Sequence, residues 1–241
     1  MRFRRRHGLL KVSGASYDTD WARRPAARTA RGVILTKVLG PAIDHYTDTR
    51  ISGAEVFETV APPVLLVSNH SSHLDTPVIL KSLPRDWRRR TAVIAAADYF
   101  YKNRAIALLV SLAFGTIPIE RARLSRDSAE LIDRLIREDW NLLMYPEGTR
   151  SRDGSMGRLR SGAAFLAVEH SIPALPLYVE GTHEAMPPGR GWPKHHQVTL
   201  HVGSPLRPAA GEDHRAFTKR LQQSLDAMVT GARPPPEAKV R

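Results

Sequence analysis

Short apolar runs alternate along the chain with longer stretches in which apolar residues recur every three or four positions. The short runs have the length and composition of buried strands. They cover residues 64–68, 93–97, 116–120, 142–145, 174–179 and 198–202. The longer stretches have the period of helices packed on one face. They cover residues 26–45, with a break near Gly40-Pro41, and residues 77–83, 104–113, 128–138, 162–170 and 212–229.

Strands that alternate with helices are typical of an α/β fold in which a central, largely parallel sheet is flanked by helices. We expect one domain over residues 25–229, with an N-terminal helical segment at 25–50 and the functional core at 60–205. Residues 1–24 predict a loosely ordered basic arm, and the proline-rich residues 230–241 predict a frayed tail. In such folds ligands bind at the carboxyl ends of the strands.

Two ionisable residues follow the first predicted strand. His70 comes just after the strand, and Asp75 lies five residues later, before a helix that Thr76-Pro77 would begin. A neutral imidazole, with a reference pKa of about 6.5, can remove a proton from an attacking hydroxyl, and a carboxylate can hold its tautomer. The alternative is that Asp75 only caps the helix. This spacing alone is a weak signal.

A second polar cluster follows the predicted strand 142–145. Within Tyr145-Pro-Glu-Gly-Thr-Arg-Ser151, Glu147 could accept a hydrogen bond from a substrate hydroxyl, and Arg150 could bind a phosphate through two hydrogen bonds. Gly148 lets backbone N–H groups approach a ligand, and Thr149 adds a hydroxyl. The alternative is an ordinary polar turn.

Two further arginines stand at comparable places. Arg121 ends the segment Gly115-Thr-Ile-Pro-Ile-Glu-Arg121 after another predicted strand, and Arg160 precedes a helix that begins with small residues. Both could bind an anion, Arg160 together with the free N–H groups of the helix start. Taken singly, each is equally consistent with a solvated arginine.

Composition narrows the class of partner. The chain has 241 residues, a formal net charge of +12 and a pI near 10.5, which favours an anionic partner: a nucleic acid, an anionic lipid or a phosphorylated substrate. The absence of cysteine excludes disulfides, thiolate zinc sites and a cysteine nucleophile. Basic residues concentrate in residues 1–31.

The hydropathy pattern bears on membrane contact. No apolar run reaches the roughly 18 to 20 residues that a spanning helix needs; the longest candidate is 105–119, which could line a site for an acyl chain or form a buried helix. The start lacks the pattern of a secretory signal, so we expect a cytoplasmic protein. The basic arm and the helix at 26–45 suit an anionic membrane surface, although that helix could equally pack on the core.

The polar segments, in this order, resemble the glycerolipid acyltransferases of the 1-acylglycerol-3-phosphate acyltransferase type, over about residues 60–205. The similarity rests on Asn69, His70 and Asp75; on Gly115, Ile117, Ile119 and Arg121; on Pro146, Glu147, Gly148, Thr149 and Arg150; and on Arg160, Gly162, Pro173 and Pro176. Tyr145 stands where a phenylalanine is more usual in that family. The resemblance implies that His70 and Asp75 are the catalytic pair, that the Gly115–Arg121 and Pro146–Arg150 blocks bind the acceptor phosphate together with Arg160, and that Pro173 and Pro176 lie near the site of the acyl chain.

The resemblance also implies an activity. A fatty acyl group would move from acyl-CoA or acyl carrier protein to a hydroxyl of lysophosphatidate in phospholipid biosynthesis, with no metal and no further cofactor. The enzyme would rest on the cytoplasmic side of the membrane and bind no nucleic acid. Glycerol 3-phosphate or another lysophospholipid is the alternative acceptor. A thioesterase and a nucleic-acid-binding module are the more distant alternatives.

Overall fold

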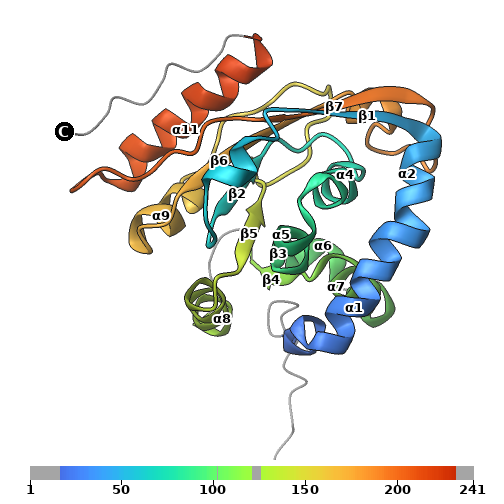
Figure 1. Ribbon diagram of the computed structural model, residues 1–241, viewed down its shortest axis with the longest axis horizontal. Coiled ribbons are helices and arrows are strands. Elements are labelled where there is room, and N and C mark those ends of the chain that lie inside the picture. The colour runs from blue at the N-terminus through green and yellow to red at the C-terminus, as the bar shows by residue number, and fades with distance from the viewer. Residues whose placement is uncertain (1–16, 102, 121–125, 232–241) are drawn as a thin grey trace, which may run out of the picture.

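The computed structural model describes residues 17–101, 103–120 and 126–231, and at its centre lies a seven-stranded sheet (Figure 1). The strands are β1 (Thr47–Ser52), β2 (Leu65–Ser68), β3 (Thr91–Ala96), β4 (Ile117–Ile119), β5 (Asn141–Met144), β6 (Ala174–Glu180) and β7 (His196–Val202). Their order across the sheet is β1-β7-β6-β2-β5-β3-β4. All neighbouring pairs are parallel except β6 and β7. The expected α/β fold with a largely parallel sheet is confirmed.

Helices cover both faces of the sheet. The longer ones are α1 (Pro25–Val33), α2 (Gly40–Tyr46), α4 (Asp75–Ser82), α7 (Arg104–Phe114), α8 (Arg126–Arg137), α9 (Gly162–Glu169) and α11 (His214–Val229). The shorter ones are α3 (Val56–Thr59), α5 (Arg85–Arg89), α6 (Ala97–Phe100) and α10 (Thr182–Ala185). In Figure 1, α8, α9 and α11 lie on one side of the sheet, and α2 and α4 lie on the other.

Alternation along the buried strands divides the core in two. Leu65 and Val67 of β2 face the layer of α8, α9 and α11, where they pack with side chains such as Ile132 and Phe217. Leu66 of β2 belongs to the opposite layer, with α2, α4 and α5. Because both faces are covered, the central strands carry apolar residues toward both layers, which explains why they read as continuous runs in the sequence.

The N-terminal helical segment differs from its predicted extent. The helix ends at Tyr46, and Thr47–Ser52 is the edge strand β1, paired with β7. Of this strand only Thr47 is buried, so its sequence carries no apolar run. The expected break at Gly40-Pro41 is also absent, because residues Ile34–Leu39 continue the helix with wider, π-type turns that accommodate the missing N–H of proline.

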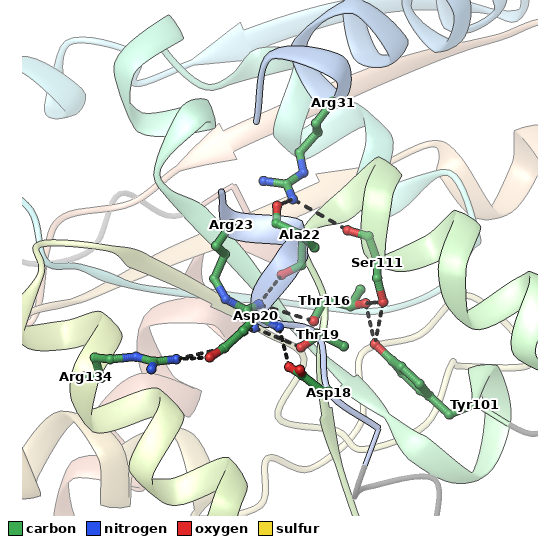
Figure 2. Close-up of polar contacts among 11 residues, drawn as sticks. Asp18, Thr19, Asp20, Ala22, Arg23, Arg31, Tyr101, Ser111, Thr116 and Arg134 are labelled. Atoms are coloured by element: carbon green, nitrogen blue, oxygen red, sulfur yellow. Dashed lines mark hydrogen bonds and ion pairs between the residues drawn. The ribbon is translucent and has the colours of Figure 1, made fainter. Parts of the chain in front are cut away.

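The predicted basic arm is too long at its C-terminal end. A 3₁₀ turn, Asp20–Arg23, packs on the body, with Ala22 and Arg23 buried. Figure 2 shows the polar contacts of this region: Arg23 donates to the hydroxyl of Thr19 at 2.9 Å, and Asp20 accepts two hydrogen bonds from Arg134 of α8, at 2.7 and 2.6 Å. Residues 19–24 therefore belong to the folded domain.

Arg31 anchors α1 to the far end of α7. Its guanidinium donates to the carbonyls of Ala22 and Leu112, and it is 2% exposed (Figure 2 draws the contact with Ala22). Burial, and then the nearby charge of Arg23, lowers the pKa of Arg31 to about 10, so it stays charged at neutral pH. Gly115, in the left-handed region with φ +65°, ends α7 beside it, and a Cβ there would lie 2.8 Å from the guanidinium carbon.

Helix α7 is not the buried helix that was one interpretation of its sequence. Leu109, Leu108 and Ile106 are 64%, 49% and 47% exposed, although Ala107 on the opposite face is fully buried. Helix α1 lies beside it (Figure 1). Val33 at the end of α1 and Val38 in the turn that follows are exposed. The two neighbouring helices thus present large apolar side chains to the surface. Within the described part of the chain, no helix combines the length and hydropathy needed to cross a bilayer.

Candidate active site

The candidate site lies where the central strands end at one edge of the sheet. His70 follows β2, Tyr99 lies beyond β3, Glu147 follows β5, and Thr182 follows β6. Parallel pairing of β2 with β5, β6 with β2, and β3 with β5 brings these carboxyl ends together. Residues far apart in the sequence therefore meet in one place, as expected for this fold.

His70 and Asp75 form the predicted pair. The His70 Nδ1 atom is 2.8 Å from Asp75 Oδ2, the histidine side chain is 20% exposed, and the carboxylate is fully buried. An ionised carboxylate only accepts hydrogen bonds, so Nδ1 of His70 is the donor in this contact, and in a neutral imidazole of that tautomer Nε2 has a free lone pair. The His70 ring stacks on Tyr145 with centroids 4.1 Å apart, which fixes its plane.

Asp75 is held by three further donors. The N–H groups of Ser71 and Ser72 donate to Oδ2 at 2.8 and 2.9 Å, and the hydroxyl of Thr182 donates to Oδ1. These bonds compensate the loss of water around a buried charge. The carboxylate lies in the first turn of α4 and binds the loop that precedes it. The alternative role for Asp75, a helix cap, therefore does not describe its hydrogen bonds.

Glu147 links two loops through its carboxylate. Its Oε1 accepts the N–H of His70 at 2.7 Å, and its Oε2 accepts the N–H of Gly157 at 2.7 Å. Burial raises the pKa of Glu147, and the two backbone bonds partly oppose that rise. A second bond, from Ser151 N to the His70 carbonyl at 2.8 Å, joins the same loops. In the structure Glu147 positions the backbone of the histidine.

Arg150 lies on the outer side of the site. Its Nη2 donates to the hydroxyl of Tyr99 at 3.2 Å, and its guanidinium lies 5.4 Å from the centre of that ring. The Tyr99 hydroxyl is also 3.2 Å from Nε2 of His73. Partial burial, and then the charge of Arg150, lowers the pKa of His73 to about 4. A neutral imidazole, a phenol and a guanidinium thus form one polar wall near His70 and Asp75.

The other predicted binding residues are placed differently. Gly148 has φ +77°, and a Cβ on it would lie 3.0 Å from Nε of Arg160, so the turn requires glycine. Thr149 is exposed in the same turn, and Arg160 is exposed on the side of α11. The structure brings His70, Asp75 and Glu147 into hydrogen-bonding contact, with Arg150 beside them. Arg121 lies outside the described residues.

Four residues of the site were missed at the level of sequence. Tyr99 and Thr182 each follow the end of a strand, and that position was their only signal. His73 lies inside the His70–Asp75 segment itself. The Asn69 side chain, matched to the family without a role, bonds the backbone of Val179 on β6 in both directions, at 2.9 and 2.8 Å.

The fold and site together define an α/β protein whose paired histidine and aspartate can act as a general base. A sequence model of the family described as Acyltransferase matches residues 48–180, which is more than half of the chain. The chain therefore belongs to the acyltransferase family.

Particular relatives agree with that assignment. The chloroplastic 1-acyl-sn-glycerol-3-phosphate acyltransferase BAT2 of Brassica napus is 29% identical over 168 residues, which are 68% of this chain and 47% of that protein. The human 1-acyl-sn-glycerol-3-phosphate acyltransferase beta is 33% identical over 120 residues, 48% of this chain and 41% of that protein. The chain thus spans less than half the length of either relative.

A solved structure supports the fold. The 1-acyl-sn-glycerophosphate (LPA) acyltransferase PlsC from Thermotoga maritima superposes with a TM-score of 0.66 at 22% identity. The superposition covers 93% of this chain and 84% of that one. The likeness therefore extends over most of the chain and supports the α/β fold.

Proposed function

We propose that the protein transfers a fatty acyl group from a thioester carrier, acyl-CoA or acyl carrier protein, to the free hydroxyl of lysophosphatidate. The observation that carries the proposal is the 2.8 Å contact between His70 Nδ1 and the buried Asp75, which leaves Nε2 able to accept a proton. The similarity to proteins named 1-acyl-sn-glycerol-3-phosphate acyltransferases supports the acceptor.

The reaction follows from the pair. Nε2 of His70 takes the proton of the acceptor hydroxyl as its oxygen bonds to the thioester carbonyl carbon. The tetrahedral intermediate then expels the thiolate, and the imidazolium returns the proton to that sulfur, so the products are an ester and a free thiol. Asp75 stabilises the imidazolium while it exists.

Arg150 is the described cation that we assign to the acceptor phosphate. It follows Glu147 in the loop after β5, and its side chain belongs to the polar wall formed with Tyr99 and His73. A guanidinium can bind a phosphate through two parallel hydrogen bonds. Arg121, which lies outside the described residues, and Arg160 retain this role as predictions of the family resemblance. Gly148 and Thr149 contribute the shape and the exposed hydroxyl of the same turn.

His70→Ala tests the function. The variant should lose acyl transfer by at least about 100-fold, the contribution of a general base, while its circular dichroism and melting temperature stay close to those of the parent. The assay uses radiolabelled acyl-CoA or acyl carrier protein with a panel of acceptors: lysophosphatidate, glycerol 3-phosphate, other lysophospholipids and water. His195→Ala, an exposed histidine in the segment before β7, is the matched control.

Each outcome of that assay has a meaning. Retention of more than about a tenth of the rate by His70→Ala would contradict the general-base assignment. Preferred acylation of glycerol 3-phosphate would replace the proposed acceptor, and release of free fatty acid to water would make the protein a thioesterase.

We further propose that the apolar surface of α1 and α7 rests on an anionic membrane, on the cytoplasmic side. Exposed Val33, Val38 and Leu109 would enter the interface, where the excess of basic residues would favour anionic lipids. Removal of residues 1–45 is not a clean test, because Leu35 and Ile43 belong to the core. Val38→Gln with Leu109→Gln should instead reduce flotation with anionic liposomes, and equal flotation would refute this placement.

A further inference from the structure

A groove outside the catalytic pair has no assigned ligand. It encloses about 1040 Å³ between the loop 156–161 and helix α11. Four basic residues line it: Arg158 and Arg160 from the loop, and Arg215 and Lys219 from the helix. None of its lining residues, all of which the structure describes, is acidic. The positive charge of this lining favours an anionic ligand.

The groove cations differ from the other charged residues of α11. No described carboxylate forms an ion pair with any of the four, whereas the adjacent Arg220 pairs with Glu212 at 2.7 Å. Arg215 and Lys219 are four residues apart, so both project from one face of the helix. Cations on one face repel each other, which an anionic ligand would relieve.

Fixed contacts hold the two walls of the groove together. The Leu159 N–H donates to the side-chain oxygen of Gln222 on α11 at 2.9 Å. The side chain of Leu159 is buried and, with Met156, gives the lining an apolar portion. The groove thus offers both cations and apolar surface.

The groove also adjoins the catalytic histidine. Gly157, which lines it, donates to the same Glu147 carboxylate that accepts the His70 N–H. Arg160, a second lining residue, contacts the Gly148 turn. A ligand in the groove would therefore lie next to the loops that carry the proposed catalytic groups.

We propose that this groove binds the phosphate groups of coenzyme A, the leaving part of the acyl donor. The inference rests on the proposed acyl transfer, which requires a thioester donor as well as a phosphorylated acceptor. Coenzyme A carries a pyrophosphate and a 3′-phosphate, and guanidinium and ammonium groups bind such anions strongly. Arg158, Arg215 and Lys219 then serve the donor, and Arg150 serves the acceptor phosphate.

Direct binding of coenzyme A tests the assignment without turnover. The double variant Arg215→Gln with Lys219→Gln should raise the dissociation constant of coenzyme A by about tenfold or more, as expected for lost charge-assisted bonds. Dephospho-coenzyme A, which lacks the 3′-phosphate, should bind the parent more weakly than coenzyme A does, and the double variant should discriminate less between the two. Arg50→Gln with Arg85→Gln removes two exposed charges elsewhere and should bind like the parent.

Steady-state kinetics separate the donor from the acceptor. The groove variant should raise the KM for acyl-CoA and leave the KM for the acceptor and kcat close to the parent. Equal coenzyme A binding by parent and groove variant would overturn the inference, as would a parent that accepts acyl groups from carrier protein but does not bind coenzyme A. If coenzyme A binds as expected and no acyl transfer occurs, the proposed function fails while the groove assignment stands.

Discussion

Two buried polar networks lie in different parts of the molecule, one around Asp75 and one around Arg31. They differ in how completely the charged group at the centre is hydrogen-bonded. Asp75, at the centre of the proposed catalytic network, accepts hydrogen bonds from His70, Ser71, Ser72 and Thr182. Arg31 in the N-terminal network donates to backbone carbonyls, and its Nη1 has no partner although it is buried.

The two networks would serve different purposes if His70 acts as proposed. Every bond to Asp75 orients a loop or a ring at the carboxyl ends of the strands, so the network preorganises a reacting group. The bonds of Arg31 join helix α1 and the preceding turn to α7, with the carbonyl of Leu112 as one acceptor. We infer that the first network governs the rate and the second governs the stability of the N-terminal helices.

The largest effect should come from Asp75→Asn. An amide has one accepting oxygen, so it cannot serve both the two backbone N–H groups and Thr182 while also holding the His70 tautomer. We expect kcat to fall by about 100-fold to 10,000-fold. Acyl transfer assays measure kcat, and thermal melts show whether the lost hydrogen bonds also lower the stability. The exposed Asp86→Asn is the control. A loss below tenfold would mean that Asp75 does not support the base.

The second effect concerns Arg31→Met. The carbonyls of Ala22 and Leu112 would lose their donor, and the free energy of unfolding should fall by about 2 kcal/mol. Urea denaturation measures this change, and the exposed Arg24→Met should stay within about 0.5 kcal/mol of the parent. The rate per folded molecule should not change. A variant that remained as stable as the parent but transferred acyl groups slowly would show that the two networks are coupled.

The smallest effect concerns His73 at the edge of the catalytic network. Its pKa of about 4 lies below the reference value near 6.5, so any stability that its neutral form contributes is present above pH 6.5 and is lost as the pH falls through about 4. Removing the Arg150 charge with Arg150→Gln should raise this pKa, although burial should keep it below 6.5. Histidine NMR titration measures it, and Arg50→Gln should leave it unchanged.

Much of the fold could be predicted because the buried strands carry apolar residues toward both faces of the sheet. The six predicted strands are present, but β1 was missed, since an edge strand with one buried residue has no apolar run. The continuity of the helix through Gly40-Pro41 was not predicted. The π-type turns before it accommodate the proline, and such turns have no simple sequence signal.

The candidate site was predictable only where its partners are close in sequence. His70 and Asp75 are five residues apart, and the spacing was visible. Thr182 is 107 residues from Asp75, and Glu147 acts through backbone N–H groups, one of them 77 residues away. Contacts made by backbone groups across the sheet leave no pattern of side chains in the sequence, so these roles required the structure.

The side chain of Asn69 matters for the design of a new scaffold that carries this site. Its amide bonds both the N–H and the carbonyl of Val179, so it imitates a peptide unit and takes the place that the main chain of β2 would fill beside β6. The backbone is thereby released to form the catalytic loop while β6 keeps its partner. Aspartate lacks the donor and leucine lacks both groups, so a scaffold designed to carry the histidine should inherit this asparagine with it.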